Sequence, residues 1–413
     1  MMIEIGKRAK AAARAMAAAS TGVKDEALAG IARALKENAD DILDANTADL
    51  ERGEAGGVAR ALLDRLMLTP ERIDSIAGAV RDVIALRDPV GEVIGGRKRP
   101  NGLDITEVRV PLGVVGIIYE ARPNVTVDAA ALCIKSGNAC ILRGSRTAIE
   151  SNTVLARLIR GALADAGLPG DAVQLVEDTS RESVGELMKM RGTVDVLIPR
   201  GGAELIRSVV EGSSVPVIET GVGNCHVYVD AAADVSKAIP IVINAKTHRP
   251  SVCNAAESLL VHRAIADDVM PKIIEELSAR GVEIRGDEAT RSYSDAVVPA
   301  TEEDYRTEFL DLTISAKIVG TLDEAIEHVN THGTLHTEAI VTEDYSAAQR
   351  FAAEVDAACV MINASTRFAD GGEFGLGAEI GISTQKLHAR GPFALEALTT
   401  SKYVVRGSGQ VRE

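Results

Sequence analysis

The first fifty residues alternate apolar and polar positions with the period of an α-helix. Alanine, leucine and charged residues dominate residues 4–51 and no proline occurs there, but the pattern is interrupted near 21–22 and 38–41. Consecutive helices are therefore predicted over this stretch. A further helix is expected over 69–86, because Thr69 is a good cap and the proline after it suits the first helical position.

Between residues 91 and 110 the hydrophobic period changes from that of a helix to that of a strand. Leu103 and Ile105 alternate with polar neighbours, and a Pro-Asn-Gly turn stands at 100–102. This pattern predicts an antiparallel hairpin. It is either a plain surface hairpin or a contact between subunits.

From residue 114 onward, short apolar runs alternate with segments of helical period. The predicted strands are 114–118, 139–142, 173–176, 194–198 and 215–218, and the predicted helices are 125–136, 149–166, 182–190 and 203–211. Such alternation is typical of right-handed βαβ units around a parallel sheet. A nucleotide is therefore expected beyond the carboxyl ends of these strands.

A second series of strands and helices follows. The predicted strands are 257–261, 282–285, 313–319, 339–341 and 359–362, and the predicted helices are 266–280, 321–332 and 346–356. The sequence thus predicts an α/β protein with two parallel-sheet domains. Their expected bounds are 1–225, which includes the hairpin, and 226–364, followed by a return segment over 365–413.

The chain ends in a strand-like segment, 402–405, that has no neighbouring strand in the sequence. Such a strand is expected to add to the edge of another sheet. Together with the hairpin at 91–110, it indicates a homodimer.

Composition excludes several classes of function. The net charge of −15 argues against nucleic acid or an anionic membrane as the main partner, since both require a basic surface. With six Tyr, five Phe and no Trp, platforms for base stacking are not expected either. No apolar stretch reaches the roughly 18 residues of a membrane span. The Ala-rich start, 1–20, lacks a strongly apolar region and is expected to be helical and not a targeting peptide.

The five cysteines form no CxxC pair and no zinc-like spacing, which favours a reducing, cytoplasmic compartment. Cys253 differs from the others, because Lys246, His248 and Arg249 lie within seven residues of it, just before an apolar run. Nearby positive charge and partial exposure populate the thiolate. Cys253 is therefore either a reactive nucleophile or one more small buried hydrophobic residue.

Three segments resemble the gamma-glutamyl phosphate reductase family, also called glutamate-5-semialdehyde dehydrogenase, within the aldehyde dehydrogenase superfamily. They are RPSVCNA at 249–255, PLGVVGIIYEARPNV at 111–125 and VGTLDEAIEHVNTHGTLHTEAI at 319–340. The chain departs from the commonest family residues at His248, Ser251 and Val329, where Gln, Gly and Ile are usual. The resemblance covers about residues 5–405 and implies two Rossmann-like domains of the aldehyde dehydrogenase type, the first binding the cofactor and the second carrying Cys253.

The chain has no G-x-G-x-x-G fingerprint after its first strand and no P-loop. The superfamily nevertheless binds a nicotinamide cofactor without that motif, and GNACILRGSR at 137–146 resembles its cofactor-binding strand. The resemblance implies that Arg143, Ser145 and Arg146 contact the cofactor. A cation at Arg146 suits a 2′-phosphate, so NADP (NADPH) is expected. Alternatively, both arginines are simply solvated. The glycine-dense stretch 371–377 is either a mobile loop or a phosphate cradle.

The resemblance also implies roles around the reacting carbonyl. Asn124 and the backbone N–H of Cys253 are expected to hold the oxyanion, although Asn124 alone also reads as an ordinary helix cap. Arg122, together with His248 and Arg249, is a candidate for binding the substrate's phosphate or carboxylate. Glu219 falls where hydrolytic aldehyde dehydrogenases carry a base, and in a reductase Glu219 and Gly221 are expected to position the nicotinamide or a loop.

The three histidines at 328, 332 and 336 could suggest a metal, but no carboxylate-rich pocket is evident in the sequence around them, and no metal is predicted. The implied reaction is the NADPH-dependent reduction of L-glutamyl 5-phosphate to L-glutamate 5-semialdehyde through a thioacyl intermediate on Cys253. The alternatives are an aldehyde-oxidising dehydrogenase with Glu219 as base, a non-catalytic nucleotide-binding relative, and a thiol hydrolase. Expected partners are a second copy of the chain, as a homodimer or dimer of dimers, and transiently glutamate 5-kinase.

Overall fold

The computed structural model describes residues 1–58 and 60–412, and the chain divides into two compact units. Unit 1 comprises Met1–Thr220, Gly375–Gly381 and Phe393–Glu413. Unit 2 comprises Gly221–Phe374 and Ile382–Pro392. No helix among the described residues is long and apolar enough to cross a membrane.

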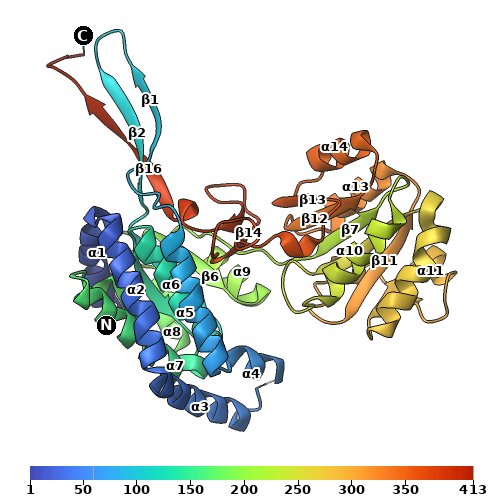
Figure 1. Ribbon diagram of the computed structural model, residues 1–413, viewed down its shortest axis with the longest axis horizontal. Coiled ribbons are helices and arrows are strands. Elements are labelled where there is room, and N and C mark those ends of the chain that lie inside the picture. Colours follow the sequence, from blue (N-terminus) through green and yellow to red (C-terminus); the bar gives the residue numbers. More distant parts are fainter. Residues whose placement is uncertain (59, 413) are drawn as a thin grey trace. The chain divides into compact units, whose positions relative to one another are not determined.

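Unit 1 begins with the predicted succession of helices. These are α1 (Met2–Ala18), α2 (Thr21–Glu37), α3 (Ala39–Ala55), α4 (Arg60–Leu66) and α5 (Pro70–Ala85). Thr69 caps α5 as expected, since its Oγ1 accepts a hydrogen bond from Arg72 N at 3.2 Å. Helices α2 and α5 pack on each other and on α6 (Pro123–Lys135) and α7 (Ile149–Asp165), so the helical layer rests on the helices of the sheet (Figure 1).

The parallel sheet of unit 1 has four strands in the order β5-β4-β3-β6. They are β3 (Val114–Tyr119), β4 (Ala139–Arg143), β5 (Val173–Leu175) and β6 (Val196–Arg200), and α8 (Arg181–Met188) and α9 (Ala203–Gly212) complete the βα units. The prediction of a strand at 215–218 was wrong. Only an isolated bridge between Leu197 and Val217 forms there, because Pro216 has no N–H with which to continue the ladder.

A three-stranded antiparallel sheet projects from the rest of unit 1 (Figure 1). It consists of β1 (Val93–Lys98), β2 (Asp104–Pro111) and β16 (Thr399–Arg406), which confirms the hairpin. The terminal strand adds to the edge of this hairpin sheet, as expected for a strand that has no neighbouring strand in the sequence. Strand β16 pairs with β2 along its whole length, from Thr399 opposite Pro111 to Arg406 opposite Asp104.

Unit 2 contains a seven-stranded parallel sheet in the order β10-β9-β11-β8-β7-β12-β13. The strands are β7 (Cys225–Val229), β8 (Ala256–His262), β9 (Glu283–Gly286), β10 (Val298–Pro299), β11 (Thr313–Val319), β12 (Thr337–Val341) and β13 (Cys359–Ile362). The major helices are α10 (Val235–Thr247), α11 (Arg263–Ala279), α13 (Leu322–His332) and α14 (Tyr345–Glu354), with a short α12 (Glu288–Arg291).

Apolar cores lie on both faces of this sheet. Alternate residues of a strand point to opposite faces, so Val227 packs under α10 and α11 while Tyr228 packs under α13 and α14 (Figure 1). The three-layer arrangement confirms the predicted α/β class, although the sequence pattern did not predict β7 or α10. Remaining short elements are β14 (Gly381–Ser383), β15 (Gly391–Phe393) and the 3-10 turns η1 (Arg146–Ala148), η2 (Gly170–Ala172), η3 (Asp304–Arg306), η4 (Thr366–Phe368) and η5 (Glu396–Leu398).

Candidate active site

The loop that carries Cys253 connects α10 to β8 and is closed at its base by an ion pair. Lys246 Nζ lies 2.5 Å from Glu257 Oε2, and both side chains are fully buried. Glu257 Oε1 also accepts a hydrogen bond from Leu310 N at 3.1 Å. Burial raises the pKa of Glu257 to about 7 and lowers the pKa of Lys246. Lys246 therefore holds the two ends of the loop together and is not an exposed cation beside the thiol.

Cys253 is partly exposed, whereas the other four cysteines are buried. Its peptide carbonyl accepts a hydrogen bond from Cys225 Sγ at 3.2 Å. On the same carbonyl, Gly223 approaches so closely that a Cβ at that position would fall 1.5 Å from the oxygen. Burial raises the pKa of Cys225 well above its usual value, so that residue stays a neutral thiol and a donor. The backbone of Cys253 is thus fixed by residues that local sequence could not identify.

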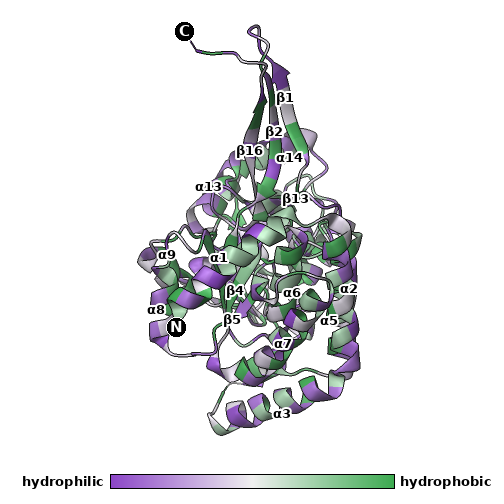
Figure 2. Ribbon diagram, turned by 90° about the vertical axis from the view of Figure 1, so that its left-hand side faces the viewer, coloured by the Kyte–Doolittle hydropathy of each residue, from purple (hydrophilic) through white to green (hydrophobic). Residues whose placement is uncertain are grey.

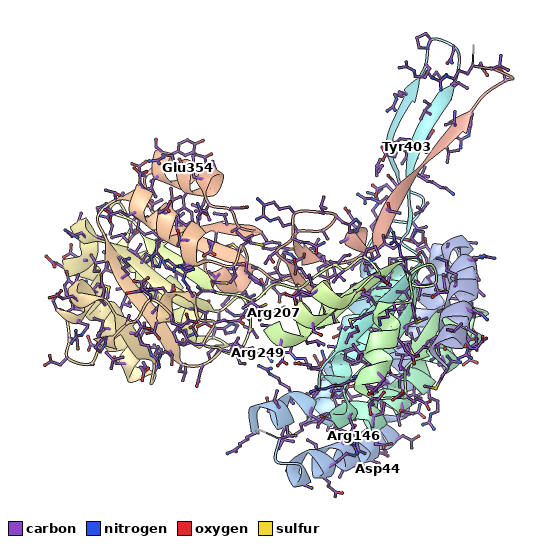
Figure 3. All side chains as sticks on the ribbon, turned by 180° about the vertical axis from the view of Figure 1, so that it is seen from behind. Asp44, Arg146, Arg207, Arg249, Glu354 and Tyr403 are labelled. Atoms are coloured by element: carbon purple, nitrogen blue, oxygen red, sulfur yellow. The ribbon has the colours of Figure 1, made fainter. Side chains whose placement is uncertain are left out.

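The next residue, Asn254, ties this loop to the segment after β13. Asn254 Nδ2 donates to the carbonyl of Ala369 at 2.9 Å. In the same segment, Arg367 Nε donates to His248 Nδ1 at 3.4 Å. Burial lowers the pKa of Arg367, while Asp370 and Cys253 act to raise it. A second arginine, the exposed Arg249 labelled in Figure 3, lies on the loop itself.

Arg367 was not among the residues predicted for the site. The residues it contacts lie more than a hundred positions earlier in the chain, so spacing could not reveal it. The only available sign was a cation in a polar stretch just before the glycine-dense segment 371–377.

In unit 1, the predicted cofactor residues lie at and after the carboxyl end of β4. The Arg143 guanidinium is buried and donates to the Ser180 carbonyl at 2.7 Å, the Gly144 carbonyl at 3.0 Å and Ser183 Oγ at 3.3 Å. Arg146, at the start of η1, is exposed (Figure 3). Arg143 is therefore held rigidly within its unit, whereas Arg146 presents a solvated cation.

Two buried polar atoms near this strand end have no hydrogen-bond partner among the described residues. They are Ser145 Oγ and Asn152 Nδ2. Gly144 leaves no room for a side chain, because a Cβ there would lie 2.3 Å from Asn152 Nδ2. Buried polar groups without a partner call for a ligand that can bond to them. Because these groups lie at the carboxyl end of a parallel strand, a nucleotide is a suitable ligand.

Asn124 lies in the first turn of α6, directly after β3. Its Nδ2 donates to Asp128 Oδ2 at 2.9 Å, one helical turn later. Burial raises the pKa of Asp128 to about 6. Arg122 occupies the N-cap position of the same helix. The resulting geometry holds the Asn124 amide in a fixed orientation at the helix start.

Glu219 is partly buried in an extended segment after α9, next to Thr220, whose Oγ1 donates to the Pro199 carbonyl at 3.0 Å. Gly221 opens unit 2, and its N–H donates to the Ile382 carbonyl at 2.8 Å. A Cβ at Gly221 would fall 2.1 Å from Thr384. Both predicted residues therefore lie in backbone that is tightly anchored.

Three histidines of unit 2, His226, His328 and His332, pack against one another. The rings of His328 and His332 lie 4.3 Å apart, and burial lowers the pKa of His328 to about 2. His226 pairs with the buried Glu338 at 2.9 Å, and His336 Nδ1 lies 2.9 Å from Thr337 Oγ1. Among the described residues, no group of three or more His, Cys, Asp or Glu is arranged to hold a metal ion.

The chain resembles known proteins over nearly its whole length. The model of the aldehyde dehydrogenase family matches residues 2–294. Gamma-glutamyl phosphate reductase from Thermobifida fusca is 59% identical over 99% of this chain and 98% of that protein. The protein of the same name from Clostridium novyi is 57% identical over 100% of this chain and 99% of that protein.

Solved structures agree with these relatives. The crystal structure of gamma-glutamyl phosphate reductase from Thermotoga maritima superposes with a TM-score of 0.97 at 51% identity, covering 100% of this chain and 99% of that one. An acetylating aldehyde dehydrogenase from Geobacillus thermoglucosidasius has a TM-score of 0.70 at 18% identity, covering 99% of this chain and 97% of that one, which shows a shared fold.

Proposed function

The chain belongs to the gamma-glutamyl phosphate reductases of the aldehyde dehydrogenase family, and we propose how its residues carry out the reaction of that family. It is an oxidoreductase of proline biosynthesis that reduces L-glutamyl 5-phosphate to L-glutamate 5-semialdehyde and releases phosphate. The observation that carries the proposed mechanism is the setting of Cys253. It is the one partly exposed cysteine, on a loop whose backbone is fixed by Gly223 and Cys225.

The Cys253 thiolate attacks the acyl carbon of the substrate, and the C–S bond replaces the bond from that carbon to the phosphate oxygen. Asn124 Nδ2 and the backbone N–H of Cys253 donate to the oxyanion that develops on the carbonyl. The support for Asn124 is its anchored amide, since Asp128 accepts from the same nitrogen and holds its orientation.

The cofactor is NADP, and in its reduced form it supplies the hydride that converts the thioacyl group to the aldehyde level. Arg143 fixes the conformation of the chain at the end of β4 through its three hydrogen bonds. Ser145 Oγ, a buried hydroxyl without a partner among the described residues, and the exposed Arg146 would hold the cofactor, and Arg146 would pair with its 2′-phosphate. Glu219 and Gly221 position the backbone around the nicotinamide.

The substrate's charged groups bind to Arg122, His248 and Arg249, which carry positive charge or hydrogen-bond donors at loop or helix ends.

We further propose a homodimer or a dimer of dimers formed through the projecting sheet. Figure 2 shows hydrophobic and hydrophilic residues mixed along these strands, and the exposed apolar side chains include Val93, Ile94 and, on β16, Tyr403. We place the enzyme in the cytoplasm, where Cys253 stays reduced and glutamate 5-kinase is a transient partner.

The test runs the reaction in the oxidative direction with glutamate 5-semialdehyde. We expect NADP reduction that requires added phosphate and is abolished in Cys253→Ala. Turnover with water in place of phosphate would favour the aldehyde-oxidising dehydrogenase with Glu219 as base. Full turnover of Cys253→Ala would exclude the thioacyl mechanism. Comparing NAD with NADP, in the wild type and in Arg146→Ala, tests the cofactor preference.

A further inference from the structure

Arg367 lies beside the nucleophile without any role assigned to it so far. It belongs to η4, whose next residue, Ala369, accepts the hydrogen bond from Asn254 Nδ2 at 2.9 Å. Asn254 follows Cys253 directly in the chain. One side-chain hydrogen bond therefore fixes the backbone around Arg367 to the backbone of the nucleophile loop.

The Arg367 guanidinium keeps unused donors. Within the described part of the chain, its one side-chain hydrogen bond runs from Nε to His248 Nδ1 at 3.4 Å, which leaves Nη1 and Nη2 without an acceptor. The side chain is partly buried, and that burial lowers its pKa. A partly desolvated arginine with two open donors favours an anion that can accept two hydrogen bonds side by side, such as phosphate or carboxylate.

The charges around this guanidinium are mixed but favour an anion. Arg249 adds a second positive charge and Asp370 a negative one, while Cys253 and Cys225 are the thiols that interact with it. The Asp370 carboxylate is already occupied in its own turn, since its Oδ1 accepts from Gly372 N at 2.8 Å and from Glu373 N at 3.4 Å. Among the described residues, Asp370 interacts with the guanidinium through its charge and not through a hydrogen bond.

We propose that Arg367 binds the phosphate group of the acyl phosphate and stabilises it as the leaving group, an inference that rests on the function proposed above. The phosphate is joined directly to the carbon that Cys253 attacks, whereas the α-carboxylate lies at the far end of the glutamyl chain. A cation anchored beside the nucleophile therefore faces the phosphate.

The step balances without any further reagent. In the reductive direction the thiolate forms the C–S bond, and the electron pair of the breaking C–O bond leaves with the phosphate, whose added negative charge the guanidinium offsets. In the oxidative direction a phosphate oxygen attacks the thioacyl carbon and releases the thiolate, and the phosphate proton passes to solvent.

The reaction in the oxidative direction distinguishes phosphate binding by Arg367 from binding of the substrate's carboxylate. A first turnover, which forms the thioacyl enzyme and one equivalent of NADPH, needs no phosphate, and only the later turnovers do. We expect Arg367→Ala to keep the first-turnover burst at the same semialdehyde concentration. Its kcat/KM for phosphate should fall about 10- to 100-fold, the loss expected for charge-assisted hydrogen bonds. Arg367→Lys should show an intermediate loss, and added guanidinium ion should partly restore Arg367→Ala.

The matched control is Arg350→Ala, which removes an exposed arginine paired with Asp323 and Glu354 on α14 and should change neither the burst nor the phosphate dependence. Should Arg367→Ala fail to fold, Arg367→Gln replaces it. An unchanged phosphate dependence in the Arg367 variants would overturn the proposal. So would a burst that requires more semialdehyde, because that result assigns Arg367 to the carboxylate of the amino acid end. If the wild type itself shows no phosphate-dependent turnover, the proposed function fails instead.

Discussion

In unit 1, Asn124 bonds to Asp128 one helical turn away, and Arg143 bonds to the adjacent Gly144 and to the start of the α8 segment. In unit 2, the Cys253 carbonyl bonds to Cys225, and the Asn254 amide bonds to Ala369. Asn124 and Arg143 are thus held by residues at most 40 positions away in the chain, whereas Cys253 and Asn254 are held by residues up to 115 positions away. A mutation far from Cys253 in the chain is therefore expected to disturb catalysis as much as one beside it.

The largest effect on stability is expected from the ion pair between Lys246 and Glu257, which joins the two ends of the loop that carries Cys253. Lys246→Met leaves Glu257 buried without its partner and should lower the free energy of unfolding by about 3–5 kcal/mol. Urea denaturation of the purified variant measures the loss. Lys237→Met, on the same helix, removes the exposed pair with Glu343 and should change stability by less than about 1 kcal/mol. Similar small losses in both variants would show that the buried pair does not secure the loop.

The next effect tests Asn124. If Asn124 donates to the oxyanion as proposed, Asn124→Ala should lower kcat about 10²- to 10³-fold. Steady-state kinetics measures the loss, and Asn330→Ala on α13 serves as the control with normal kcat. A kcat close to that of the wild type would show that Asn124 does not stabilise the oxyanion.

A third change compares two glycines. Gly223→Ala places a Cβ against the Cys253 carbonyl and must shift Cys253, the proposed nucleophile, so kcat should fall about 10²-fold. Gly78→Ala, in α5, meets no atom within 4 Å and should stabilise its helix by about 0.8–1 kcal/mol. Measuring kcat and the thermal midpoint of both variants separates displacement of the nucleophile from a general effect of replacing glycine. Normal turnover in Gly223→Ala would mean that the loop tolerates movement.

The smallest effect is a pH dependence at Asp128. Its folded-state pKa of about 6 lies above the usual 3.8, so between these values the folded protein holds a proton that the unfolded chain has lost. The stability that this group contributes is present below pH 4 and is lost as the pH rises through 6. Asp128→Asn should remove that dependence, on the order of 1 kcal/mol, in thermal unfolding followed from pH 4 to 7. If the stability of the wild type and of Asp128→Asn changed equally with pH, the raised pKa of Asp128 would be contradicted.

Much of the fold could be predicted from local patterns. The helices at the start of the chain, the hairpin and most strands follow from periodicity and caps such as Thr69. One error has a clear physical cause, because Pro216 interrupts the apolar run that was predicted to be a strand. The edge to which β16 adds could not be predicted, since its partner β2 lies some three hundred residues earlier in the chain.

The site was predictable only in part. Cys253 could be proposed from its flanking cations, because charge near a thiol acts locally. Cys225, Gly223 and Arg367 could not, since parallel strands and long connections bring together residues whose spacing carries no signal. Lys246 illustrates the same limit, because its partner Glu257 becomes visible only when α10 and β8 are placed side by side.

The central claim is that Cys253 carries the acyl group. Wild-type protein mixed with glutamate 5-semialdehyde and NADP, without phosphate, would be quenched in acid within one turnover, digested and examined by mass spectrometry. The account predicts a single glutamyl group on the peptide that contains Cys253, which disappears when phosphate is added before the quench. A glutamyl group on any other residue, or turnover by Cys253→Ala, would contradict it.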